Sequence, residues 1–139
     1  MRRLGILALL GLALASCSTP IEGDLTAVCA DTSHEEASYF DEVMAEEFFE
    51  VHCTVCHSRD LPEGVGPGSR RGAPLSFNYN THEGATLLPE ATWDRIADRT
   101  MPPMGREVDD AEAALVKEWL GCQLALQQLP EGDDDDSAR

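Results

Sequence analysis

Basic residues are scarce in this sequence, and a long apolar run is missing. Lys and Arg together number 10 against 26 Asp and Glu, which gives a formal net charge of −16 over 139 residues. Nucleic acid and anionic membrane surfaces are therefore poor partners, because binding to either needs a cationic footprint. The N-terminal apolar run over residues 4–15 is too short to cross a bilayer, which takes roughly 20 apolar residues. Alternating strand patterns and internal repeats are also missing, so we expect one small, almost wholly helical domain.

The first 17 residues have the features of an export signal. Two arginines precede the apolar run and small side chains lead up to Cys17, which predicts a signal peptide over residues 1–16. Leu14-Ala15-Ser16-Cys17 resembles the bacterial lipobox, which implies that Cys17 receives lipid and anchors the chain to a membrane. Ser18 resembles the residue found in lipoproteins sorted to the outer membrane. We expect an exported, lipid-anchored protein on the periplasmic side, on the outer rather than the inner membrane; the alternative is a cleaved signal with Cys17 unmodified.

Three segments follow the predicted signal peptide. Residues 17–38 carry no sustained period and suit a tether, residues 39–128 hold the patterned domain, and residues 129–139 form an acidic tail that should be disordered. Loss of Arg2 and Arg3 with the signal peptide changes the formal charge from −16 to −18. This charge suits a protein partner with a basic docking surface, although solubility alone is the simpler explanation for most of the acidic residues.

Periodicity and helix caps divide the domain into helices and one long loop. An apolar stripe at helical spacing predicts a first helix over residues 41–52. The stripe consists of Phe40, Val43, Met44, Phe48 and Val51. Residues 58–74 are rich in Gly, Pro and Arg and predict a loop. The later helices are expected over residues 82–87 with Thr81 as N-cap, over 89–99 from Pro89, and from an Asp109–Glu112 capping box to about Leu126.

The motif Cys53-Thr54-Val55-Cys56-His57 carries the most specific chemical signal. Two cysteines at this spacing can each add to a vinyl group at the edge of a haem, and the next residue then lies beneath the iron. His57 is at that position, and imidazole is a good axial ligand. The motif therefore predicts one covalently bound haem c.

Zinc binding and thiol redox chemistry are the alternatives for this motif. A structural zinc site would need two further ligands, normally a second close pair, whereas Cys29 and Cys122 are far apart and the remaining histidines form no close pair. Thioredoxin-like chemistry needs the first cysteine at the start of a helix that follows a strand. Here the motif follows a helix, so both alternatives are weaker than haem.

The arrangement of motifs is similar to that of class I cytochromes c. The similarity rests on "FFEVHCTVCHS", the Gly/Pro-rich loop, "RTMPPM" and a final helix ending in "EWLGC", and it covers residues 39–126. It resembles in particular the bacterial haem domains with a Met-Pro-Pro loop. The resemblance implies a cytochrome c fold in which the N- and C-terminal helices cross near one edge of the haem.

The same resemblance implies a methionine as the second iron ligand. Met101 matches the Met-Pro position of the family, and a proline-stiffened loop can hold its sulfur at a fixed distance from iron. Met104 is the alternative, and His82, another residue or an open position are not excluded. The arginines Arg70, Arg71 and Arg99 could neutralise the haem propionates. The alternative for each of them is a solvated position on the surface.

Further residues are expected around the haem. Phe77, Tyr79 and Trp93 should wall the pocket, and the carbonyl group of Pro74 should lie near the outer nitrogen of His57. A hydrogen bond to that nitrogen would orient the imidazole. His52, directly before the motif, is expected to be an ordinary residue at the end of the helix.

Two cysteines remain after haem and lipid are assigned. The topology of the family brings the segments that carry Cys29 and Cys122 together, so an oxidising periplasm favours a disulfide between them; two free thiols are the alternative.

These features predict an electron carrier and not an enzyme. The expected function is the transfer of single electrons between redox proteins by a membrane-tethered, His/Met-ligated haem. Two alternatives stay open: a haem c subunit of a larger redox enzyme, and a haem enzyme or sensor with an open or labile distal site.

Overall fold

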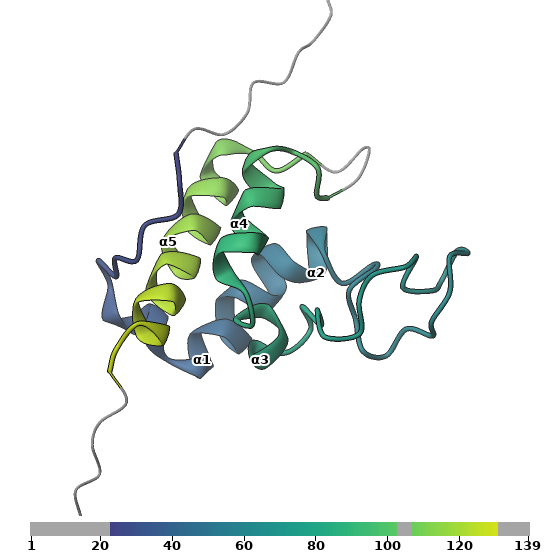
Figure 1. The fold of residues 1–139 in the computed structure, drawn as a ribbon, viewed down its shortest axis with the longest axis horizontal. Helices are drawn as coiled ribbons and strands as arrows, with labels where there is room; N and C mark the ends of the chain where they lie inside the picture. The colour runs from purple at the N-terminus through teal and green to yellow at the C-terminus, as the bar shows by residue number, and fades with distance from the viewer. Residues whose placement is uncertain (1–22, 103–106, 131–139) are drawn as a thin grey trace, which may run out of the picture.

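The computed structural model describes residues 23–102 and 107–130, and these residues form a small all-α fold (Figure 1). No strand occurs within the described ranges. The helices are η1 (Thr32–Glu35), α1 (Ala37–Tyr39), η2 (Phe40–Phe49), α2 (Glu50–His52), α3 (His82–Ala85), α4 (Pro89–Ala97) and α5 (Asp110–Gln127). The predicted all-α class is thus confirmed. The predicted signal peptide, Cys17, Met104 and residues 131–139 of the predicted tail lie outside the described residues.

The first long helical segment runs without a break through α1, η2 and α2, and its centre is π-helical. The N–H group of Glu50 donates to the carbonyl group of Ala45, five residues earlier. This wider winding alters which residues face the core, because the predicted stripe assumed ordinary α-helical spacing. Phe49, which the stripe omits, is fully buried, whereas Val51 is 46% exposed. The prediction for Val51 was therefore wrong.

The later helices begin where the sequence predicts. Thr81 caps α3 by accepting a hydrogen bond from the N–H group of Gly84 at 3.2 Å, and Pro89 opens α4. Asp109 and Glu112 form the predicted capping box of α5. The ends are less accurate, because α3 stops at Ala85 and α4 at Ala97, two residues before each predicted end.

The core contains six aromatic residues among its thirteen buried members and lies where η2, α4 and α5 meet (Figure 1). Trp119 on α5 contacts Phe40 and Phe49 on η2, with ring centroids 5.8 and 5.4 Å apart. On α4, Trp93 is buried and its ring lies 5.0 Å from the Nζ atom of Lys117. These contacts fix the helix that leads into the CTVCH motif. None of the helices that the structure describes has the length and apolar character needed to span a membrane.

Residues 23–36, which the sequence assigns to the tether, are packed along α5. A disulfide joins Cys29 to Cys122, as predicted. The Nε1 atom of Trp93 donates to the carbonyl group of Gly23 at 2.9 Å, and the side chain of Gln123 donates to the carbonyl group of His34 at 2.7 Å. Because backbone carbonyl groups make these contacts, side-chain periodicity gives no sign of them. The packed part of the chain therefore begins well before residue 39.

Candidate functional site

The CTVCH motif forms a single turn at the end of α2. The N–H group of Cys53 donates to the carbonyl group of Phe49 at 2.8 Å, and the N–H group of His57 donates to that of Cys53 at 2.9 Å. Both thiols are free. Cys53 packs against the core and Cys56 is buried. Helical hydrogen bonds thus place two thiols and an imidazole on one short, fixed turn.

The thiol of Cys53 is held in its protonated form. Burial raises its pKa to about 12, and the neighbouring Cys56 adds to the shift because two thiolates would repel each other. Thiol–disulfide exchange needs a thiolate at neutral pH. The environment of Cys53 therefore disfavours the thioredoxin-like alternative.

The imidazole of His57 is also kept neutral. Burial is the largest effect and lowers the pKa of His57, and the positive charge of Arg70 lowers it further. The backbone of Phe77 raises this pKa and so offsets part of the shift. The Nδ1 atom of His57 is buried and makes no hydrogen bond of ordinary geometry. Neutral imidazole is the form that binds metals.

Aromatic residues cover one side of the motif. The ring of Tyr79 lies 5.0 Å from that of His57 and stacks on Phe49 at 5.3 Å, and Phe77 lies 6.3 Å from Tyr79. The N–H group of Tyr79 also donates to the carbonyl group of His57 at 2.7 Å. The structure thus brings Tyr79 and the neighbouring Phe77 to the motif. Trp93 belongs to the same core cluster, but its indole N–H is bonded to Gly23 on the α4–α5 side.

Met101 follows α4, and its N–H group donates to the carbonyl group of Arg95 at 2.9 Å. Its side chain is 43% exposed. Of the two methionines considered as iron ligands, Met101 is the one that the structure describes. Met101 is therefore a largely exposed residue in this structure.

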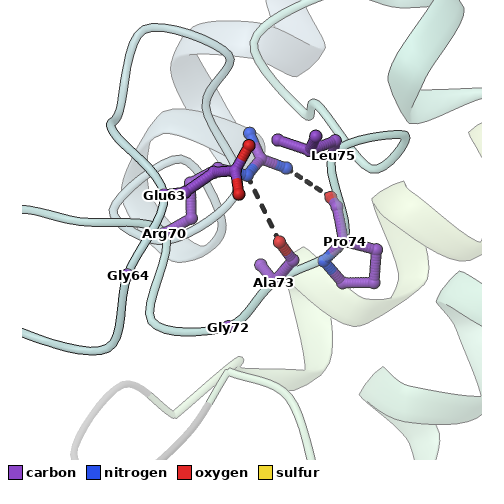
Figure 2. A pocket seen from close by; sticks show the side chains of 7 residues that line it. All are labelled: Glu63, Gly64, Arg70, Gly72, Ala73, Pro74 and Leu75. Atoms are coloured by element: carbon purple, nitrogen blue, oxygen red, sulfur yellow. Dashed lines mark hydrogen bonds between the residues drawn. The ribbon is translucent and has the colours of Figure 1, made fainter.

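The loop between the motif and α3 is organised by Arg70, which is 2% exposed (Figure 2). Its side chain donates to the carbonyl groups of Ala73 and Pro74, and Figure 2 shows both bonds. A pocket of about 270 Å³ lies beside it, lined by Glu63, Gly64, Arg70, Gly72, Ala73, Pro74 and Leu75. The carbonyl group expected from Pro74 at His57 is therefore turned to Arg70 instead, and the backbone that acts on His57 is that of Phe77.

His52 is more than a residue at a helix end. It is 5% exposed, and its Nε2 atom lies 3.1 Å from the Oε1 atom of Glu112 on α5. The same carboxylate accepts from the N–H group of Asp109 at 2.9 Å. Glu112 therefore ties the start of α5 to the residue before Cys53. Sequence reasoning missed this pair because its members are 60 positions apart.

The described residues contain no set of side chains that could serve as zinc ligands. Over residues 23–102 and 107–130, no group of three or more His, Cys, Asp or Glu residues could hold a metal ion.

No protein-family model, curated protein or solved structure matches this chain. The fold and the site define a small all-α protein with a CxxCH motif on the turn that follows α2.

Proposed function

We propose that this protein is a monohaem cytochrome c, tethered to a membrane and facing the periplasm, that transfers single electrons between redox proteins. The observation that carries this proposal is the turn over residues 53–57, on which two free thiols precede a neutral imidazole. Covalent attachment of haem c needs this set of groups in this order.

The residues present fit such a group. Cys53 and Cys56 would attach haem through thioether bonds, and His57 would be one axial ligand of the iron. Met101 would be the other, with Met104 as the alternative. When bound, the haem supplies one-electron exchange between Fe(III) and Fe(II), and His/Met ligation raises its reduction potential.

The surrounding residues prepare these groups for the cofactor. Burial keeps the imidazole of His57 uncharged, so that no proton has to leave before the iron binds. Stacking of Tyr79 on Phe49 keeps water from one side of the motif. The hydrogen bond from Tyr79 to the carbonyl group of His57 fixes the backbone that carries the axial ligand.

Charge and the predicted anchor define the expected partners. A net charge of −16 favours redox proteins with a basic docking surface and disfavours nucleic acid. A lipid on Cys17 would hold the protein at the membrane, the outer rather than the inner one, and would limit diffusion to partners nearby.

A second function is supported by the exposure of Met101. A methionine that is 43% exposed has to move inwards or be covered by the cofactor before it can act as a stable ligand. A haem enzyme or sensor with a labile distal position is therefore the competing proposal. The two proposals differ in the spin state of the ferric iron.

Spectroscopy of the purified, full-length protein tests both proposals. We expect a c-type pyridine haemochromogen and, in the ferric form, a low-spin spectrum with the long-wavelength sulfur-to-iron charge-transfer band. The Cys53→Ala/Cys56→Ala variant should lose covalent haem, whereas the matched Cys29→Ser/Cys122→Ser variant should keep it, because only the first pair belongs to the motif.

Replacement of the proposed methionine ligand separates the carrier from the competing function. Met101→Ala should remove the charge-transfer band and leave the covalent haem in place. A wild-type protein with high-spin ferric haem would support the enzyme or sensor. A protein expressed together with a haem-attachment system and still lacking covalent haem would refute both proposals.

A further inference from the structure

We infer that Arg70 is a positioning residue for His57: it holds the two chain segments that fix the proposed axial ligand, and it does not bind a haem propionate. This inference rests on the proposed function only in calling His57 an iron ligand. The juxtaposition of Arg70, His57 and Tyr79 is a property of the protein chain itself.

All donor capacity of the Arg70 guanidinium is used within the loop. A guanidinium has five N–H groups. Nε donates to the carbonyl group of Ala73 at 3.3 Å, and Nη1 donates to the carbonyl group of Ser58 and to Oδ1 of Asn78, both at 2.6 Å. Nη2 donates to the carbonyl groups of Phe77 at 2.9 Å and of Pro74. A propionate could be bound only after one of these bonds is broken.

The acceptors lie on both sides of His57. Ser58 directly follows it in the chain, while Phe77 and Asn78 directly precede Tyr79, whose N–H group donates to the carbonyl group of His57 at 2.7 Å. One guanidinium therefore joins the segment that leaves the motif to the segment that packs on it. The 5.0 Å contact between the rings of His57 and Tyr79 depends on this junction.

Close packing on the far side of Asn78 strengthens the junction. A Cβ atom at Gly84 in α3 would lie 2.2 Å from the carbonyl oxygen of Asn78, so the backbone of Asn78 is pressed directly against the helix. The side-chain amide of Asn78 donates to the carbonyl group of Leu75 at 2.7 Å. Arg70 thus connects the turn of His57 to a segment that α3 holds in place.

Among the residues that the structure describes, the buried positive charge of Arg70 is compensated by hydrogen bonds and not by an ion pair. Within the described residues no carboxylate lies at ion-pair distance from Arg70. Five neutral oxygen atoms accept its hydrogen bonds in place of water. A buried charge is costly unless it is fully hydrogen-bonded. Lysine has three donors and no planar fork, so it can keep the charge but cannot rebuild the junction.

The test compares Arg70→Lys and Arg70→Gln with the matched variants Arg71→Lys and Arg71→Gln. Arg71 is the neighbouring arginine and its side chain is exposed. The first readout is the orientation of the His57 ring in the ferric full-length holoprotein. It is measured from the g-values in electron paramagnetic resonance and from the hyperfine-shifted ring protons in NMR spectra. Both Arg70 variants should shift these signals, and both Arg71 variants should reproduce the wild type.

The second readout needs no haem. Hydrogen exchange of the Tyr79 amide, which is bonded to His57, should be about tenfold faster in Arg70→Lys than in Arg71→Lys, because the junction opens more often. If both Arg70 variants fail to fold, Asn78→Ala decides, since it removes one of the five acceptors and should shift the same signals by a smaller amount.

Wild-type ring signals and wild-type exchange of Tyr79 in the Arg70 variants would overturn the inference. So would a shift confined to the haem propionate signals, which would make Arg70 a propionate partner. A wild-type protein without covalent haem refutes the proposed function alone, because the exchange contrast at Tyr79 still decides the role of Arg70.

Discussion

At the scale of single residues, the hydroxyl group of Tyr79 links the CTVCH motif to α4. It lies 2.9 Å from the hydroxyl group of Thr92, and both groups are buried. Burial raises the pKa of Tyr79 to about 12, while the hydrogen bond to Thr92 acts in the opposite direction. The phenol therefore stays protonated in the folded protein under conditions that ionise it in the unfolded chain.

Tyr79→Phe tests this link at neutral pH. The variant loses the bond and leaves the Thr92 hydroxyl without its partner, so we expect the free energy of unfolding to fall by about 1–2 kcal/mol at pH 7. Denaturant unfolding measures the change. Adding Thr92→Val should recover part of the loss, because the pair is then removed together.

The same variant has a distinct pH profile. An unfolded tyrosine ionises near pH 10, whereas the pKa in the folded protein is about 12. Between these values the unfolded chain binds fewer protons, so the wild type loses stability as the pH rises, and Tyr79→Phe should lose less. An identical decline for both proteins would show that the pKa of Tyr79 is the same in the folded and unfolded states.

Local chemistry accounts for what the sequence predicted at this scale. The CTVCH spacing, the Thr81 cap and the Asp109–Glu112 box each involve residues within four positions of one another, so their geometry follows from the local backbone. The role of Arg70 and the partner of His52 depend on where distant segments meet. Nothing in the sequence near these residues marks those contacts.

At the scale of helices and segments, Gly121 allows the N-terminal segment to lie directly on α5. A Cβ atom at this position would stand 2.7 Å from the carbonyl oxygen of Thr26 and 3.1 Å from that of Val28. Both obstacles are backbone atoms, which cannot rotate away as a side chain can. Glycine at position 121 has a lower helix propensity than alanine, but it lets the N-terminal segment pack directly against α5.

Gly121→Ala should destabilise the protein by about 1–3 kcal/mol, which is typical of overpacking, although alanine favours an isolated helix by about 1 kcal/mol. Gly66→Ala is the matched control, because a Cβ atom there meets nothing within 4 Å. Thermal unfolding of both variants measures the difference. A gain in stability for Gly121→Ala would mean that the segment moves aside without loss.

The winding of η2 shows where helix prediction reached its limit. Apolar periodicity correctly indicated a helix over most of residues 37–52, because any helical winding repeats every few residues. It could not distinguish α from π winding, although the winding decides that Phe40 and Phe49 both meet Trp119 on α5. The π winding also explains why Val51 is exposed, although α-helical spacing places it on the apolar stripe.

At the scale of the whole molecule, the Cys29–Cys122 disulfide closes most of the described chain into one loop. The two cysteines are separated by 93 positions, and the loop contains the CTVCH motif and every helix from η1 to most of α5. Its sulfur atoms are remote in sequence from the thiols of the motif, which stay free. The sequence identified this pair only through the resemblance to a family, since spacing alone does not determine connectivity.

Removal of this disulfide should cost about 4–5 kcal/mol of unfolding free energy, because an uncrosslinked chain of this loop length gains much entropy when it unfolds. Cys29→Ser/Cys122→Ser should therefore unfold at clearly lower denaturant concentration, and added reductant should destabilise the wild type but not the variant. Limited proteolysis should also cut residues 23–36 faster in the variant, since the covalent tie to α5 is gone while the contacts of Trp93 and Gln123 remain. Equal unfolding midpoints and equal cleavage rates would show that these hydrogen bonds alone hold the segment. The disulfide would then be dispensable for positioning the packed domain relative to its predicted anchor.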